Sequence, residues 1–194
     1  MPTLFRNTAV VMLVLLLTAC TTKLSPPVSV TTPRSVYVLD HGHHTSLVLS
    51  DASGHYYRYA YGDWRYYALT ETGPWSGLRA LLTPTQAALG RREFTADGSV
   101  QNIIRAAGVT TERVIELQVE AERVDALHQQ LEQIYQDNLP TRHRQPAHNF
   151  DFVKHPQPYT LRHNSNRMVA DWLTQMDVTV SRRPTVTTWQ LEPP

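Results

Sequence analysis

Three histidines fall within four residues in the run His41-Gly42-His43-His44, just before an apolar, β-branched segment. Imidazole is a common general base and a common zinc ligand. His41 and His43 would point to one side of a strand, and His44 or a distant histidine could complete a zinc site (His148, His155, His163). Thr45 stands where the metallo-hydrolase pattern His-x-His-x-Asp-His has its aspartate, so we expect no metal site and no cofactor.

A second polar cluster, His163-Asn164-Ser165-Asn166-Arg167, precedes an apolar pattern with helical spacing. Asn or Ser at such a position commonly caps the helix through its side-chain oxygen. The Ser165 hydroxyl could also act as a nucleophile, but only with an oriented base and its carboxylate partner. Capping and catalysis are compatible, so the residues alone leave both interpretations open.

The elements that would position these residues are strands followed by helices. We expect strands over 35–40, 44–50, 55–62 and 113–119, helices over 75–82, 121–138 and 165–176, and an edge strand over 177–181. Residues 141–163, rich in His and Pro, are expected to form an irregular loop, and residues 84–110 give no clear signal. This order predicts an α+β fold, with a small antiparallel sheet packed against a few helices.

Aromatic residues are dense in the third predicted strand and just after it: Tyr56, Tyr57, Tyr59, Tyr61, Trp64, Tyr66 and Tyr67. Strand alternation puts Tyr57, Tyr59 and Tyr61 on one face, which is typical of core packing. The alternative is a groove for glycan or acyl chains, completed by Trp75 and Tyr159. Tyr61 and Trp64 are therefore candidate binding residues.

The amino-terminal residues have the form of an export signal. Arg6 supplies a positive charge, residues 9–17 are apolar but too few to span a bilayer, and Leu17-Thr18-Ala19-Cys20 resembles the lipobox of bacterial lipoproteins. We expect residues 1–19 to be removed and Cys20 to be lipidated. Residues 20–33 would then form a flexible tether, residues 34–183 a single globular domain, and residues 184–194 a C-terminal tail.

Charge and location limit the partners. Arg6 is the only charged residue in the signal, so the remaining Lys and Arg balance the Asp and Glu, and we expect no nucleic-acid partner. Thr21 follows the cysteine where inner-membrane retention would favour aspartate, so we expect the outer membrane, with the domain facing the periplasm. The membrane is then a partner through Cys20, and peptidoglycan, lipid or another envelope protein is a candidate ligand.

Several motifs together resemble a known family. Val36-Tyr37-Val38, His41 to Leu49, Tyr61-Gly62-Asp63-Trp64 with Tyr66, and Asn164-Ser165-Asn166 are similar to a bacterial family of unknown function, some of whose members are named for lying near urease genes. That family in turn resembles the circularly permuted branch of papain-like NlpC proteins, which includes lecithin retinol acyltransferase-like proteins. The resemblance runs in order over residues 35–176.

The resemblance implies a strand histidine paired with a cysteine that opens a helix near the C-terminus. Those positions correspond to His44 and Ser165. Asp63 is the first candidate for the residue that orients the imidazole, and His55 is the second. His41, Asn164 and Asn166 would complete the site. A serine hydroxyl is a much weaker acid than a thiol, so the helix dipole alone cannot ionise it.

Two hypotheses follow from the serine at position 165, where the resembling family has a cysteine. The domain is either a binding protein or pseudoenzyme that has lost its nucleophile, or a serine-dependent hydrolase or acyl transferase using Ser165 and His44. In the second case backbone amides near Ser165 and Asn166 would stabilise the oxyanion.

Overall fold

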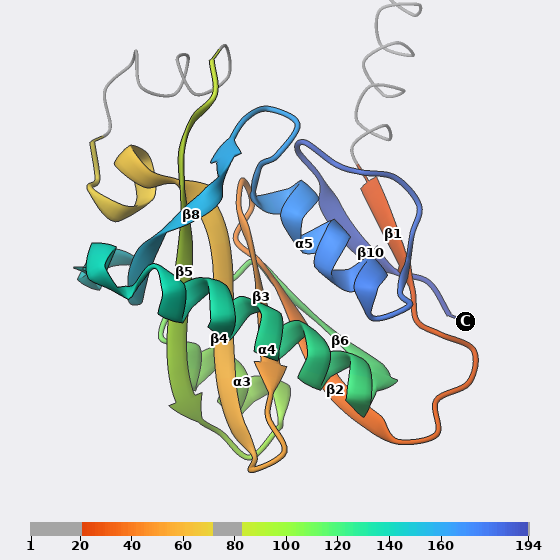
Figure 1. Ribbon diagram of the computed structural model, residues 1–194. Coiled ribbons are helices and arrows are strands. Elements are labelled where there is room, and N and C mark those ends of the chain that lie inside the picture. The colour runs from red at the N-terminus through yellow and green to blue at the C-terminus, as the bar shows by residue number, and fades with distance from the viewer. Residues whose placement is uncertain (1–20, 72–82, 194) are drawn as a thin grey trace, which may run out of the picture.

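The computed structural model describes residues 21–71 and 83–193. Its main feature is a seven-stranded antiparallel sheet in the order β6-β2-β3-β4-β5-β8-β7 (Figure 1). The strands are β2 (Pro33–Asp40), β3 (Thr45–Ser50), β4 (His55–Asp63), β5 (Thr85–Thr95), β6 (Arg113–Glu120), β7 (His143–Gln145) and β8 (Phe150–Tyr159). The predicted α+β class is confirmed, although the sheet is larger than expected.

Helices cover both faces of this sheet. The helices α4 (Ala121–Asp137) and α5 (Ser165–Gln175) lie on one face, and α3 (Val100–Ala107) lies on the other (Figure 1). Because side chains alternate along a strand, Leu47 and Leu49 of β3 join the core under α4 and α5, whereas Val48 joins the core under α3. This alternation also decides which functional side chains can meet.

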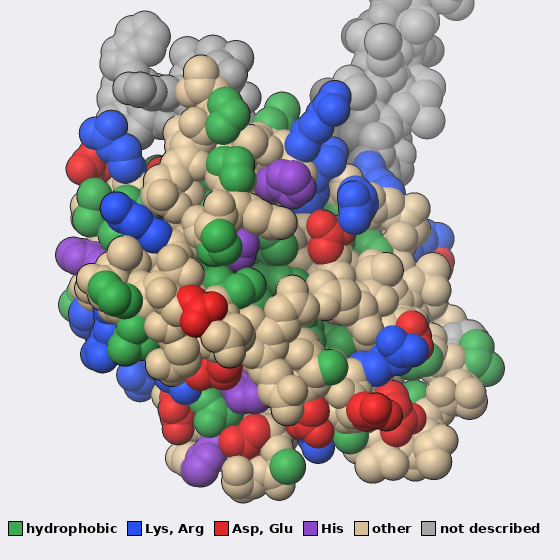
Figure 2. Space-filling view, viewed as in Figure 1, with side chains coloured by type: hydrophobic (Ala, Val, Ile, Leu, Met, Phe, Trp, Pro, Cys, Tyr) green, Lys and Arg blue, Asp and Glu red, His purple; other side chains and the backbone are tan. Residues whose placement is uncertain are grey.

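The two long helices were predicted correctly. Val124, Leu127 and Leu131 of α4 form a buried stripe, as their helical spacing indicates. At the start of α5, the side chain of Asn164 accepts a hydrogen bond from the Arg167 backbone N–H at 3.0 Å, so Asn164 is the N-cap. Figure 2 shows side chains of both charge signs mixed over this face.

The predicted loop over 141–163 was wrong, because it contains β8, a ten-residue strand beside β5. The loop was predicted because the segment is rich in His and Pro, and Pro156 and Pro158 lie within the strand that forms instead. The structure accommodates them because β7 pairs only with residues 150–152, which leaves the second half of β8 with one strand neighbour, β5. A proline at such a free edge loses no ladder hydrogen bond on that side.

The segment without a clear signal contains α3. Ser99 caps its first turn, and Gly108 ends it in the left-handed conformation with φ of 62°. A short π-helix, η1 (Trp64–Ala68), follows β4, and two 3₁₀ turns, η2 (Leu139–Thr141) and η3 (Pro146–His148), flank β7. The predicted helix over 75–82 and Trp75 lie outside the described residues.

Both ends of the described chain form a second sheet, which corrects the predicted tether and tail. Strand β1 (Thr21–Ser25) pairs in parallel with β10 (Thr188–Leu191) and antiparallel with β9 (Thr179–Val180). Leu24 and Trp189 are fully buried, so apolar packing holds these strands on the domain. The folded unit therefore includes the residues directly after Cys20. Among the described residues, no helix is long and apolar enough to cross a membrane.

Candidate functional site

A four-residue loop joins β2 to β3 and carries the histidine cluster. The His41 backbone N–H donates to the His44 carbonyl at 2.9 Å, and the Gly42 N–H donates to the Asp40 carboxylate at 2.9 Å. Gly42 has φ of 86°, and a Cβ there would lie 2.6 Å from a Glu112 carboxylate oxygen. The positive φ favours glycine, whereas the Glu112 side chain could move aside. The loop is therefore closely held, and His43 is its exposed residue.

His41 is fixed through both ring nitrogens. Its Nδ1 lies 2.7 Å from the Thr110 carbonyl and its Nε2 lies 2.9 Å from the Ser46 hydroxyl. A carbonyl only accepts, so Nδ1 carries the proton and neutral Nε2 accepts from Ser46. The His41 ring is thereby held in one orientation in the pocket lining, and it has no free nitrogen for a metal.

His44 has a different environment. Its ring centroid lies 4.6 Å from that of Tyr67 and 6.0 Å from that of His41. Its Nδ1 is shielded from solvent and has no hydrogen-bond partner. Buried polar atoms are normally paired, so this nitrogen is available to a molecule that enters the pocket.

Tyr67 reaches His44 because η1 turns directly after β4. Asp63 caps this turn, and its Oδ1 accepts from the Tyr66 backbone N–H at 2.8 Å. The ring of Tyr67 lies on Gly62, where a Cβ would come within 2.3 Å of it. Short π-helical turns are rare and often occur at functional sites. Here the turn places an aromatic ring on His44.

Arg58 projects from β4 on the same face as His44 and is fully buried. One of its terminal nitrogens donates to the His148 carbonyl at 2.6 Å and to the Asn149 carbonyl at 3.4 Å. The guanidinium carbon lies 3.9 Å from the centre of the Phe150 ring, a cation–π distance. Within residues 21–71 and 83–193, no carboxylate forms an ion pair with Arg58 and its Nε has no partner.

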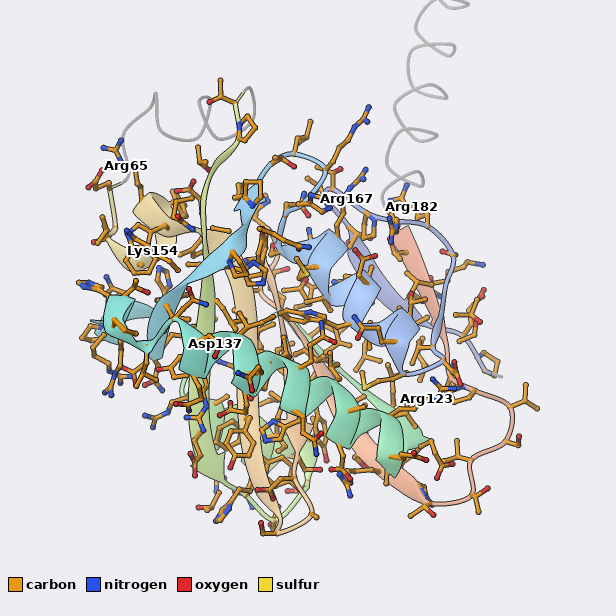
Figure 3. The ribbon with its side chains drawn as sticks, in the orientation of Figure 1. Arg65, Arg123, Asp137, Lys154, Arg167 and Arg182 are labelled. Carbon is orange, nitrogen blue, oxygen red and sulfur yellow. The ribbon has the colours of Figure 1, made fainter. Side chains whose placement is uncertain are left out.

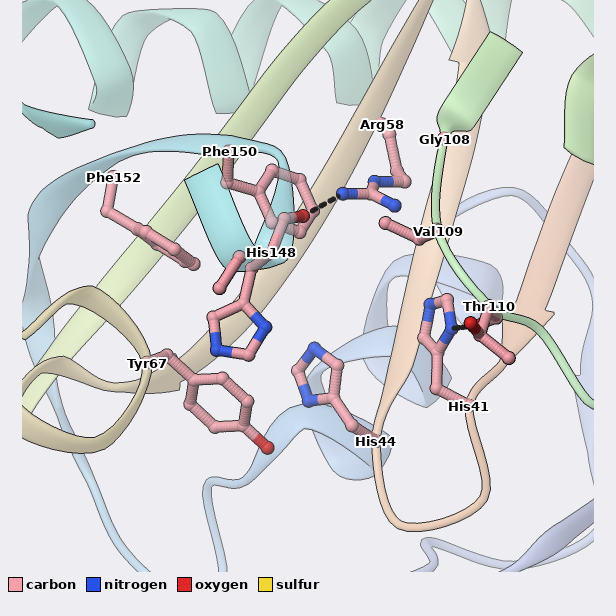
Figure 4. A pocket seen from close by; sticks show the side chains of 11 residues that line it. His41, His44, Arg58, Tyr67, Gly108, Val109, Thr110, His148, Phe150 and Phe152 are labelled. Carbon is pink, nitrogen blue, oxygen red and sulfur yellow. Dashed lines mark hydrogen bonds between the residues drawn. The ribbon is translucent and has the colours of Figure 1, made fainter. Parts of the chain in front are cut away.

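These residues enclose a cavity of about 600 Å³, within the usual range for small-molecule sites (Figure 4). The Asn149 side-chain amide donates to the Ala107 carbonyl at 3.1 Å and so ties the loop after η3 to the end of α3. The remaining walls are Tyr67, Phe150 and Phe152, the segment Gly108–Thr110, and Ala147 with His148.

The pocket disfavours additional positive charge. Burial lowers the pKa of His41, His44 and His148, and Arg58 contributes to each of these shifts because its charge repels an imidazolium. Burial, with repulsion from Arg92, also lowers the pKa of Arg58 to about 9. The histidines are therefore neutral at pH 7, and Arg58 is the cationic group of the pocket.

The predicted pairing of His44 with Ser165 finds no support in this geometry. Ser165 is buried at the start of α5 on the opposite face of the sheet, and it is Thr45 whose side chain turns toward that helix. The Thr45 hydroxyl donates to the Asn166 side chain at 2.7 Å and accepts from the Trp189 ring N–H at 2.8 Å. His44, the loop residue just before β3, lies on the other face of the sheet, where it lines the pocket.

The C-terminal segment covers the start of α5. The Asn164 and Asn166 side-chain amides each donate to the Thr185 carbonyl at 3.0 Å, and the Arg167 guanidinium contacts the Thr185 hydroxyl at 3.3 Å. Figure 3 places Arg167 and Arg182 at the end of the molecule where β1 begins. Both predicted binding asparagines therefore hold the chain's own carbonyl.

Other predicted residues also have structural partners. Asp63 bonds to Tyr66 and to the Thr85 hydroxyl, and no hydrogen bond within the described chain joins it to His44 or His55. Tyr61 lies in the core under α5 and donates to the Pro158 carbonyl at 3.0 Å, whereas the Trp64 ring lies 5.7 Å from the Lys154 ammonium. Tyr61 and Trp64 do not line the histidine pocket.

The sequence interpretation missed Arg58 and Tyr67 as members of the histidine pocket, and it had placed His148 beside the histidine cluster only as a possible zinc ligand. Arg58 gave little signal, because an arginine that alternates with Tyr57 and Tyr59 in a strand is ordinarily exposed on the opposite face, whereas the structure buries it. No group of His, Cys, Asp and Glu in the described parts of the chain has an arrangement that could hold a metal ion. Comparison with family models, with curated proteins and with solved structures finds no match to this chain.

Proposed function

We propose that this chain is a lipid-anchored, periplasm-facing envelope protein that binds a small molecule in the pocket around His44 and Arg58. One observation carries the proposal: a 600 Å³ cavity contains a buried arginine without a counterion and two buried nitrogens without partners. Such unsatisfied groups are costly in a folded protein unless they serve a ligand. The domain is then a binding protein rather than an enzyme that uses Ser165.

The location rests on Cys20 and its lipobox. The fold adds a consequence: β1 begins at Thr21, so a lipid on Cys20 would hold the domain directly at the membrane surface. This arrangement favours ligands found at that surface, including lipids and peptidoglycan fragments, or an envelope protein that presents such a group. Thr21 supports placement in the outer membrane, because retention at the inner membrane would favour aspartate at that position.

The alternative, a serine hydrolase or acyl transferase, has one supporting feature, which is Ser165 in the first turn of α5. Against it, Thr45 faces that turn, His44 lies on the other face, and Thr185 covers the helix start. A base must come within hydrogen-bond reach of the hydroxyl it deprotonates. We therefore favour binding.

Filling the pocket tests the proposal. We expect Val109→Trp to abolish saturation-transfer NMR signals from neutral aromatic fragments such as benzamide and benzyl alcohol, because Val109 lines the cavity. The matched control is Val186→Trp, at an exposed residue outside it. Equal fragment binding by wild type and Val109→Trp would contradict a ligand pocket. Fluorophosphonate labelling that Ser165→Ala abolishes would instead support the hydrolase.

A further inference from the structure

Arg58 is the unusual group of the pocket because its charge is buried without compensation. The partners of its guanidinium are two main-chain carbonyls and the face of Phe150. Carbonyl dipoles and a ring face stabilise a cation less than a carboxylate does. The residue that opposes Arg58 on β5 is Arg92, which adds positive charge.

Two nitrogens in this pocket have no hydrogen-bond partner although solvent does not reach them. They are Arg58 Nε, which is a donor while the guanidinium is protonated, and His44 Nδ1, which can donate in one tautomer. The His41 ring, in contrast, has both nitrogens engaged. The free hydrogen-bonding capacity thus lies on Arg58 and His44, and both side chains line the cavity (Figure 4).

The rest of the lining excludes some ligand classes. It contains no Asp or Glu side chain, so a cationic ligand would find no counterion among the described residues. Phe150, Phe152 and Tyr67 supply aromatic surface beside the polar groups. An anion would also relieve the repulsion by which Arg58 lowers the pKa of all three pocket histidines. The lining therefore matches a negative group carried on an apolar body.

We propose that the pocket binds a small organic oxyanion, a carboxylate or a phosphate monoester, with the anionic group on Arg58 and the apolar body against Phe150 and Phe152. His44 offers its free Nδ1 as a second contact. The inference rests on the proposed function of the pocket as a binding site. It adds the charge and shape of the ligand.

The test compares benzoate, phenyl phosphate and the neutral benzamide, using protein expressed from the full chain and purified in nonionic detergent. We expect wild type to bind at least one of the two anions about tenfold more tightly than benzamide, since charge-assisted hydrogen bonds are the stronger kind. Arg58→Met should reduce this preference to less than about twofold. The matched control is Arg123→Met on α4, on the opposite face of the sheet, which should keep the preference (Figure 3).

The outcomes separate this inference from the proposed function. Equal binding of benzamide and both anions to wild type would overturn the anion inference and leave the pocket as a binding site. Absence of binding by all three would contradict both. If Arg58→Met does not fold, the wild-type preference still decides, together with imidazole NMR of His44: benzoate or phenyl phosphate should raise its pKa, and an unchanged pKa on saturation would count against the inference.

Discussion

His44 should make the stability of the protein sensitive to mild acid. Burial, followed by repulsion from His41, His148 and Arg58, holds its pKa well below the ordinary value. The unfolded chain therefore takes up a proton near pH 6.5 that the folded chain accepts only at lower pH. The free energy of unfolding falls as the pH drops from about 6.5 through the folded pKa, and the contribution is fully present above that range.

We expect His44→Gln to lose less stability than wild type between pH 7.5 and pH 5, measured as the shift of the urea midpoint. Part of the slope will remain, because burial also lowers the pKa of His41, His128, His148 and His155. His43→Gln, at the exposed neighbour, is the control and should keep the wild-type slope. A His44→Gln slope equal to that of wild type would refute the assignment of a lowered pKa to His44.

Single residues also show what the sequence could reveal about the site. The histidine cluster and the family resemblance made His44 a candidate site residue, and the structure places His44 in the lining of a pocket. Its partners were predicted from a resemblance, whereas the fold decides them: Thr45 of β3 faces α5, and the loop residue His44 lines the pocket with Arg58 and Tyr67. Because β3 begins at Thr45, the side to which the loop residue His44 turns is not readable from the sequence alone.

The π-helical turn η1 gives Asp63 an indirect role. As its cap, Asp63 fixes the turn that holds Tyr67 against His44. We expect Asp63→Ala to lower the free energy of unfolding by about 1 kcal/mol, a cost typical of a lost N-cap. The His44 ring resonances should shift as Tyr67 loosens. Urea denaturation and imidazole NMR measure the two effects.

Asp63→Asn separates this role from that of a catalytic orienter. The asparagine side-chain oxygen can still accept from the Tyr66 N–H, so this variant should retain most of the stability and the His44 resonances. A carboxylate that polarised His44 would instead need its charge. A large change in the His44 pKa with intact stability in Asp63→Asn would therefore contradict the capping role.

Among the elements, those with strong local patterns were the predictable ones. The stripe of α4, the cap of α5 and the alternating strands β2, β3 and β4 all follow from residues close together in the chain. Strand β8 was missed because its prolines are compatible with a strand only where the partner strand β7 has ended. Such information lies in the sheet order, not in the segment.

At the scale of the whole molecule, the pairing of β1 with β10 brings the first and last described strands next to the strand that follows the histidine loop. Thr22 lies opposite Trp189 in the terminal sheet, and the Trp189 ring donates to Thr45, the residue next to His44. These contacts join residues more than 140 positions apart, so no local pattern predicts them. The start of β1, the strand that follows the proposed lipidated cysteine in the sequence, lies at the end of the domain that carries the histidine loop (Figure 1).

Trp189 tests whether this terminal sheet is part of the folded core. Its side chain is fully buried, so Trp189→Ala should lower the free energy of unfolding by about 3–5 kcal/mol, measured by urea denaturation. Trp189→Phe retains most of the apolar surface but loses the hydrogen bond to Thr45. The lost bond should lower the free energy of unfolding by about 1 kcal/mol, and the smaller ring should lower it further through lost packing. Val28→Ala, at a residue that is 90% exposed between β1 and β2, is the control and should change little. If Trp189→Ala proved as mild as Val28→Ala, β10 would be a loose tail, and the link from the terminal sheet to Thr45 would be lost with it.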